Sequence, residues 1–123
     1  MVYRKILAGV DGSPTSLKAA QRAVELAKVC GAKVTLISVG EHGRQYVSDA
    51  QDRFEGSEVA IDTVVDVGDP ADVILETATD GDYDLIVVGN KGMSGVSRFL
   101  LGSVPSKISH HSPCDVLIVH TTG

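Results

Sequence analysis

The sequence predicts one α/β domain spanning residues 1–123, built on an open, parallel, Rossmann-like five-stranded sheet with helices on both faces. β-rich apolar runs alternate with segments of helical spacing along the whole chain, which is typical of parallel sheets. Two of the helical segments begin with a polar residue followed by proline, a common helix start. The later apolar runs are short and carry no polar alternation, as expected of strands that are covered on both sides.

The first half of the chain supplies two strands, one clear helix and one weaker helix. Residues 3–10 form the first apolar run, and Ser13 and Pro14 suit the cap and first position of a helix that Gly31 ends. Apolar residues inside this helix recur at helical spacing: Leu17, Ala20, Val24 and Ala27. A strand at 33–39 follows, and then a weak helical pattern at 44–55 that Gly56 ends.

The second half repeats the alternation and completes the sheet. Residues 58–67 alternate like a strand, and Asp69-Pro70 starts the next helix. The remaining expected elements are a strand at 84–88, a short helix at 103–111 capped by Ser103, and a strand at 115–119. Five strands wound in this way, with right-handed crossovers, leave few possible topologies.

Composition limits the classes of function. Eleven basic residues against sixteen acidic ones give a net charge of −5, which argues against a nucleic-acid-binding face. No apolar run approaches the ~20 residues of a membrane span, and no signal peptide is recognisable, so we expect a cytoplasmic protein without membrane contact. Cys30 and Cys114 are expected to be buried, reduced thiols.

Two loops carry the residues that point to chemistry. Asp11-Gly12-Ser13 follows the first strand, and Gly89-Asn90-Lys91-Gly92 follows the fourth. In an open parallel sheet, ligands bind beyond the carboxyl ends of the strands where the winding reverses. If the first and fourth strands are neighbours, both loops face one crevice.

The stretch from Gly89 to Ser103 has the chemistry of an anion site. Glycines permit close backbone approach, and successive N–H groups can form a nest for an anion. Gly102-Ser103-Val104 lies at a helix start, where free N–H groups and the positive end of the helix dipole favour phosphate. The spacing matches neither the Walker A loop nor the dinucleotide fingerprint, because the chain contains no G-x-G.

The pattern Gly89-x₂-Gly92-x₉-Gly102-Ser103, with the opening VDGS and the closing PCDVLIV, resembles the nucleotide-binding branch of the universal stress protein family. The resemblance covers nearly the whole chain. It implies a sheet of strand order 3-2-1-4-5 that binds ATP or another adenine nucleotide, together with Mg²⁺.

The resemblance also implies roles for individual residues. Asp11 would lie beside the adenine, the ribose and the metal, and Val39 would meet the adenine edge through its backbone. The glycines at 89 and 92 would line the ribose and phosphates, and the 102–104 segment would hold the phosphates. The complete expected site comprises Val10, Asp11, Ser13, Val39, Gly89, Asn90, Lys91, Gly92, Gly102, Ser103 and Val104.

The chain departs from the family pattern in three places. Asn90 stands where the family often has Ser or Thr, and Pro105 lies close to the expected phosphate nest. The stretch at 40–57 is short for the family, so the flap over the nucleotide is expected to be reduced.

Three functions stay open at the level of sequence. The leading one is an ATP-binding stress-response or regulatory protein that acts through a conformational change read by an unidentified protein partner. The others are a slow ATPase or self-phosphorylating protein, and a nucleotide-independent adaptor. The family commonly dimerises through its last strand, so we expect a homodimer through Val116, Leu117, Ile118 and Val119.

Overall fold

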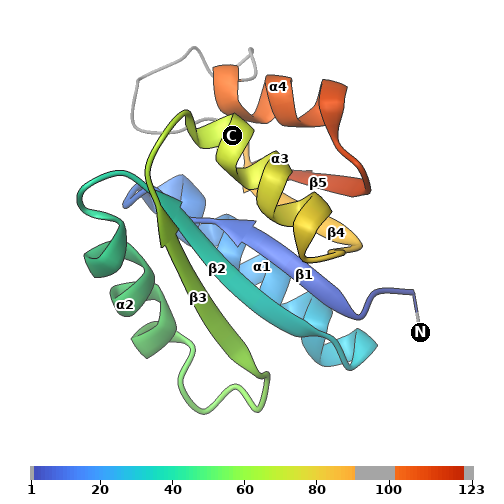
Figure 1. Cartoon of the computed structure of the whole chain (residues 1–123). Coiled ribbons are helices and arrows are strands. Elements are labelled where there is room, and N and C mark those ends of the chain that lie inside the picture. The colour runs from blue at the N-terminus through green and yellow to red at the C-terminus, as the bar shows by residue number, and fades with distance from the viewer. Residues whose placement is uncertain (1, 91–101, 121–123) are drawn as a thin grey trace.

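The computed structural model describes residues 2–90 and 102–120 and contains one sheet covered by helices (Figure 1). All strand pairs are parallel, and the strand order is β3-β2-β1-β4-β5. The predicted fold class and strand order are therefore confirmed. The elements are β1 (Lys5–Gly9), α1 (Pro14–Cys30), β2 (Lys33–Val39), α2 (Gly43–Arg53), β3 (Ile61–Asp66), α3 (Pro70–Asp80), β4 (Leu85–Gly89), α4 (Ser103–His111) and β5 (Asp115–Val119).

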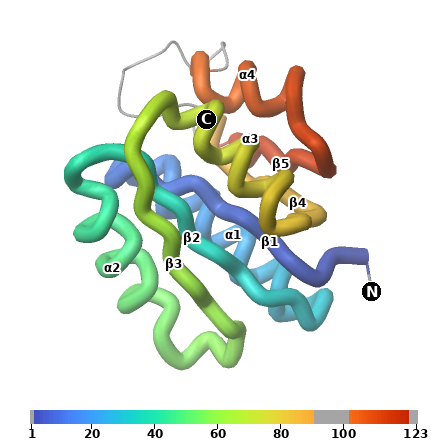
Figure 2. Tube along the Cα trace, in the orientation of Figure 1, coloured from blue at the N-terminus to red at the C-terminus, as the bar shows by residue number. Residues whose placement is uncertain are grey.

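The winding of the sheet reverses at β1. This central strand pairs with β2 on one side and with β4 on the other. Helices α1 and α2 cover one face, and α3 and α4 cover the other, as the tube view also shows (Figure 2). The carboxyl ends of β1 and β4 consequently open into one crevice at the switch point.

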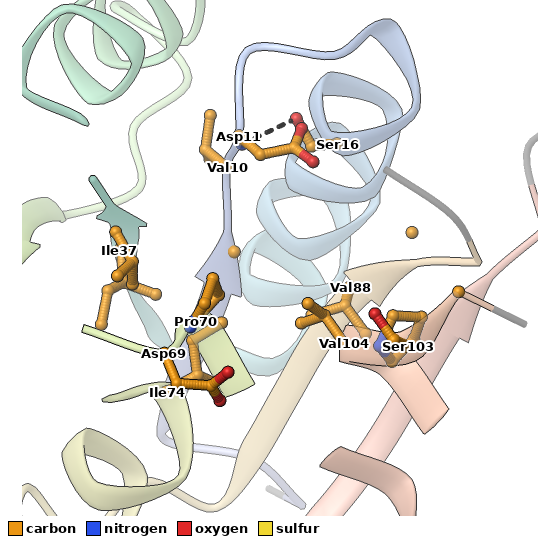
Figure 3. A pocket seen from close by; sticks show the side chains of 15 residues that line it. Val10, Asp11, Ser16, Ile37, Asp69, Pro70, Ile74, Val88, Ser103 and Val104 are labelled. Atoms are coloured by element: carbon orange, nitrogen blue, oxygen red, sulfur yellow. Dashed lines mark hydrogen bonds between the residues drawn. The ribbon is translucent and has the colours of Figure 1, made fainter. Parts of the chain in front are cut away.

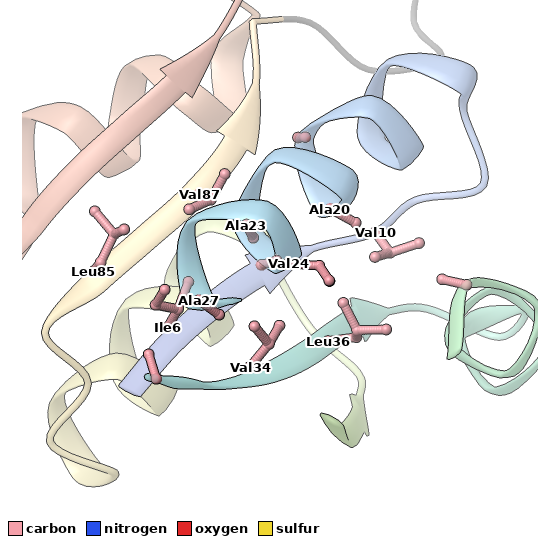
Figure 4. Close-up of a cluster of buried hydrophobic side chains, with 14 of the residues drawn as sticks. Ile6, Val10, Ala20, Ala23, Val24, Ala27, Val34, Leu36, Leu85 and Val87 are labelled. Atoms are coloured by element: carbon pink, nitrogen blue, oxygen red, sulfur yellow. The ribbon is translucent and has the colours of Figure 1, made fainter. Parts of the chain in front are cut away.

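The core on the α1 side depends on alanines. Four alanines of α1 are each at most 1% exposed, and they let the helix lie close against the strands (Figure 4). They pack over Ile6, Val34 and Leu36, which are fully buried. The opposite face packs Leu7, Ile37 and Ile86 against α3 and α4. The alanines concerned are Ala19, Ala20, Ala23 and Ala27.

The predicted boundaries of α1 are confirmed. The Ser13 hydroxyl accepts the N–H of Ser16 at 3.1 Å, and Pro14 is the first helical residue. At the other end, Gly31 adopts a left-handed conformation with φ of 73°, which glycine adopts at little cost. Local cap chemistry therefore determines both ends of this helix.

A Ser13→Ala variant is expected to lose about 1 kcal/mol of unfolding free energy, because it removes the N-cap acceptor. Urea denaturation measures the change. The control is Ser109→Ala, since the exposed Ser109 hydroxyl only donates to the Ser106 carbonyl within α4. Equal losses in the two variants would contradict a capping role for Ser13.

Several predicted boundaries were wrong by a few residues because strand ends follow the neighbouring strand. The first strand is β1, shorter than 3–10, and its pairing with β2 begins at Lys5 opposite Lys33. The expected strand at 58–67 is shortened to β3, since Glu58 has a φ of 69° and pairing with β2 starts at Ile61. The sequence shows the local apolar pattern of a strand, but it does not show which residues of the neighbouring strand it pairs with.

Two expectations about burial and capping were also wrong. Cys30 is buried as predicted, but Cys114 is half-buried; burial still raises the pKa of the Cys114 thiol. The cap of α4 is Gly102 rather than Ser103, because the Gly102 carbonyl accepts the N–H of Ser106 at 3.0 Å. None of the described helices is long and apolar enough to cross a membrane.

Candidate functional site

A cavity of about 400 Å³ lies at the carboxyl ends of the central strands, where the first residues of α3 and α4 meet them (Figure 3). Its walls combine strand ends, the loop between β1 and α1, and two helix starts. The lining residues are Gly9, Val10, Asp11, Ser16, Ile37, Val39, Asp69, Pro70, Ile74, Val88, Gly89, Gly102, Ser103, Val104 and Pro105.

One wall is the loop that carries Asp11. The Asp11 N–H donates to the Ser16 hydroxyl at 3.2 Å, the bond drawn in Figure 3, and Ser16 donates to the Ser13 carbonyl at 2.9 Å. The Asp11 carboxylate accepts the Ser13 N–H at 2.9 Å and also the Ser13 hydroxyl. The Asp11 side chain is exposed while Ser13 and Ser16 are buried. The buried Ser13 therefore orients an accessible carboxylate, while the buried Ser16 hydroxyl holds the backbone of Asp11.

The opposite wall is the start of α4. The Gly102 N–H donates to the Asn90 carbonyl at 2.9 Å, and the Asn90 N–H donates to the Val119 carbonyl at 3.0 Å. These bonds tie the helix start to the ends of β4 and β5. The N–H groups of Ser103 and Val104 belong to the first helical turn and have no acceptor within the helix, whereas Pro105 has no N–H. This wall offers two backbone donors and the Ser103 hydroxyl to an anion.

Apolar side chains from three elements line the middle of the cavity. Ile37 and Val39 come from β2, Ile74 from α3 and Val88 from β4. Figure 3 shows Ile37 on one side and Val88 and Val104 on the other. Such an apolar middle with polar groups at the margins is typical of small-molecule sites.

Gly89 has a packing role in addition to its place in the cavity wall. A Cβ atom at this position would stand 3.2 Å from the carbonyl oxygen of Thr15 and 3.4 Å from its carbonyl carbon. These are backbone atoms at the start of α1, which a side chain could not push aside easily. The absence of a side chain at Gly89 thus allows β4 and α1 to approach each other beside the cavity.

Asp69 brings a second carboxylate to the cavity and a link between α3 and α4. Its side chain caps α3 by accepting the Asp72 N–H at 3.1 Å. Lys107 of α4 lies 2.7 Å from Asp72 and 3.5 Å from Asp69. The Asp72 N–H, with Lys107 adding to the effect, holds the pKa of the Asp69 carboxyl below its usual value. The prediction that Asp69 acts at a helix N-terminus is supported by this geometry, but its place in the cavity wall was missed.

The lowered pKa of Asp69 predicts a pH dependence of stability. A carboxyl whose pKa is lowered by folding stabilises the protein above its unfolded pKa, near 3.8, and loses this contribution as the pH falls through the folded value. The stability difference between wild type and Asp69→Asn should therefore be constant near neutral pH and shrink below about pH 4. Urea unfolding from pH 3 to pH 7 measures it. Asp80→Asn at the other end of α3 is the charge-matched control, and an equal pH trend there would contradict the assignment.

The structure brings together most residues of the predicted site. Seven of them line the cavity: Val10, Asp11, Val39, Gly89, Gly102, Ser103 and Val104. Ser13 does not line the cavity, but its N–H donates to the Asp11 carboxylate. Asn90 is 2% exposed, and its carbonyl accepts the Gly102 N–H and so anchors the start of α4. The other two, Lys91 and Gly92, lie outside the described residues.

Sequence reasoning missed several cavity residues. The missed residues are Gly9, Ser16, Ile37, Asp69, Pro70, Ile74 and Val88. Nothing in the sequence distinguishes Ile37 and Val88 from other apolar strand residues. The start of α3 reaches the site only because this helix crosses over the sheet between β3 and β4. Ser16 and Asp69 had local signals, since Ser16 lies three residues after the N-cap Ser13 and Asp69 is itself an N-cap.

The described residues supply few ligands for a metal. They contain no group of three or more His, Cys, Asp or Glu side chains that could hold an ion. Asp11 offers one exposed carboxylate. This donor set fits Mg²⁺, which proteins commonly bind through one or two carboxylates together with phosphate oxygens of the ligand.

The fold and the cavity define a parallel α/β protein with a cavity at the switch point of its sheet. The sequence profile of the universal stress protein family matches residues 2–58 and 40–120. The chain therefore belongs to the universal stress protein family.

Relatives and solved structures agree with this assignment. The chain is 39% identical to a putative universal stress protein, SSP1056, of Staphylococcus saprophyticus, over 98% of this chain and 86% of the relative. It is 33% identical to the universal stress protein YxiE of Bacillus subtilis, over 96% of this chain and 99% of that protein. A universal stress protein crystallised in complex with cAMP superposes with a TM-score of 0.84, at 32% identity, covering 99% of this chain and 100% of that one.

This chain is shorter than its relatives. The first spans 144 positions, more than the 123 residues present here, so the relative contains residues that this chain lacks. The two profile matches meet within residues 40–58. In the structure, residues 40–42 alone connect β2 to α2. These observations agree with the prediction that the stretch after Val39 is short for the family.

Proposed function

We propose that this protein binds an adenine nucleotide in the cavity at the switch point and acts as a regulatory protein in the stress response. The observation that carries the proposal is one cavity that joins an apolar middle to the open N-terminus of α4 and to an oriented carboxylate, Asp11. The apolar middle suits an adenine ring, and the N-terminus of α4 suits a phosphate. The carboxylate suits a metal ion or a ribose hydroxyl.

The proposed pose follows the walls of the cavity. The base lies among the apolar side chains with its edge toward the backbone at Val39, and the phosphate meets the N–H groups of Ser103 and Val104. The ribose lies toward Gly89. When Mg²⁺ is present, Asp11 and the phosphate oxygens hold it. We include Lys91 and Gly92 in the proposed site on the family pattern alone.

The relative that was crystallised with cAMP supports an adenine-nucleotide ligand, because it is 32% identical to this chain over almost its full length. We propose ATP as the working ligand, with AMP and cAMP as the alternatives to be distinguished. Ligand binding would change the surface offered to a protein partner in the cytoplasm.

Isothermal titration calorimetry with ATP, ADP, AMP and cAMP, each with and without Mg²⁺, tests the proposal. We expect a dissociation constant in the micromolar range, about −8 kcal/mol, for at least one nucleotide. Failure of all four to bind below millimolar concentration would overturn it. Phosphate release measured in the same samples separates binding alone from slow hydrolysis.

We also propose that the protein is a homodimer through β5. This strand lies at the edge of the sheet, so one side of its backbone has no neighbouring strand among the described residues. Val116, Leu117 and Ile118 are partly exposed, whereas Val119 is 5% exposed and belongs to the core. Pairing with a second copy would cover this edge.

Light scattering at micromolar concentration is expected to give twice the monomer mass of 12.9 kDa. Ile118→Lys should shift the mass toward the monomer, because a charge in a covered apolar contact is costly. The matched control is Val65→Lys on the opposite edge strand, where the side chain is 41% exposed. A monomer mass for the wild type would refute the proposal.

A further inference from the structure

Helix α2 lies close to the sheet at its first turn. Only residues 40–42 separate it from β2. A Cβ atom on Gly43, its first residue, would stand 2.9 Å from the Val65 side chain and 3.2 Å from the Ser38 carbonyl oxygen. The short connection thus draws the start of α2 onto the carboxyl ends of β2 and β3, beside the cavity.

One turn further along, Tyr46 reaches the loop that carries Asp11. A Cβ atom on Gly12 would stand 2.6 Å from Cε1, 2.7 Å from Cζ and 3.0 Å from Cδ1 of the Tyr46 ring. The part of the ring formed by these atoms therefore lies where a side chain on Gly12 would stand, and the φ of Gly12 is 84°. The Tyr46 ring is itself supported by His42, at 6.1 Å between ring centroids, and by the apolar cluster under α1.

The contact falls in the middle of the loop that orients the carboxylate. Gly12 separates Asp11 from Ser13, and the Ser13 N–H and hydroxyl both donate to Asp11. Glycine has no Cβ and can adopt many backbone conformations, so a loop centred on a glycine keeps one conformation only when other contacts hold it. The Tyr46 ring is a surface, contributed by another helix, that restricts this glycine.

We propose that Tyr46 is a positioning residue, which holds the Asp11–Ser13 loop in its binding conformation before the ligand arrives. The consequence for ligands rests on the proposed nucleotide binding. Ordering a loop in advance lowers the cost of association, which is otherwise subtracted from affinity.

The geometry predicts which substitutions matter. Ring atoms make the contact with Gly12, so Tyr46→Phe should behave like the wild type. Tyr46→Ala removes the surface, and Tyr46→Leu keeps apolar volume under α2 without a flat ring. Leucine is the variant to use if the alanine variant is unstable.

The first measurement needs no nucleotide. ¹⁵N relaxation is expected to give order parameters near 0.85 for the Gly12 and Ser13 amides in the wild type and Tyr46→Phe, and below about 0.6 in Tyr46→Ala or Tyr46→Leu. The Asp72 amide is an internal control, because it donates to Asp69 in the equivalent cap of α3. Unchanged order parameters at Gly12 and Ser13 in both ring-free variants would overturn the proposal.

The second measurement links positioning to the ligand. Tyr46→Ala is expected to bind nucleotide with Mg²⁺ about tenfold more weakly, a difference of about 1.4 kcal/mol. The loss should be smaller without Mg²⁺, since Asp11 would then have no metal to hold. A wild type that fails to bind overturns the proposed function, and the relaxation data still decide on Tyr46. A wild type that binds, with equal affinity in Tyr46→Ala and Tyr46→Phe, overturns the role of Tyr46 in binding.

Discussion

Gly102→Val is expected to lose adenine-nucleotide binding, with affinity falling at least about a hundredfold, while the fold is retained. Gly102 lines the cavity and precedes the two N–H groups proposed to hold the phosphate. A branched side chain there would occupy the space of the ligand. A hundredfold loss corresponds to about 2.7 kcal/mol, within what several charge-assisted hydrogen bonds contribute.

The backbone of Gly102 permits this test. Its φ of −63° and ψ of 164° are extended values that any residue can adopt, and its bonds to Asn90 and Ser106 use backbone atoms only. Because Gly102 is buried, thermal unfolding is measured beside binding, to separate a lost site from a destabilised fold. Ser103→Ala is the graded control, because it keeps the N–H and removes only the hydroxyl, and it should lose a few-fold in affinity. A Gly102→Val variant that binds like the wild type would place the phosphate elsewhere.

Local signals in the sequence were sufficient to predict the helix starts next to the site. Ser13-Pro14 and Asp69-Pro70 both form the caps that their residue types predict. The bounds of α4 at 103–111 were also predicted, but its cap was assigned to Ser103, because the true cap, Gly102, supplies only backbone atoms. Capping by side chains can be read from residue type, whereas capping by backbone alone cannot.

The composition of the cavity was predictable only in part, for reasons of topology. Asp11 lies just after β1 and Gly89 is the last residue of β4, and the order of the elements suffices to bring them together. Asp69 and Ile74 approach the same cavity from a crossover helix, and their contribution depends on the angle at which α3 packs. The contact of Tyr46 with Gly12 is similar, because it depends on the length of the connection before α2.

Gly12→Ala is expected to lower the unfolding free energy by about 2–5 kcal/mol, the largest stability effect that we predict. Two costs add. The left-handed φ of 84° costs a residue with a Cβ about 1–2 kcal/mol, and the methyl group would collide with the Tyr46 ring at 2.6 Å. Overpacking of this kind adds about 1–3 kcal/mol.

Gly31→Ala separates the two costs. Its φ of 73° is similar, but a Cβ there meets nothing within 4 Å, so only the conformational cost of about 1–2 kcal/mol remains. Urea denaturation of both variants measures the difference, and equal losses would show that the Tyr46 ring moves aside freely.

The double variant Gly12→Ala/Tyr46→Ala completes the test. If the collision with the ring accounts for the excess, removing the ring should make the Gly12 substitution cost no more than the Gly31 substitution does. The coupling free energy from the cycle should then be about 1–3 kcal/mol, as is typical of residues in direct contact. Additive losses would instead mean that the backbone of the Asp11–Ser13 loop alone sets the requirement for glycine, and that helix α2 does not restrain it.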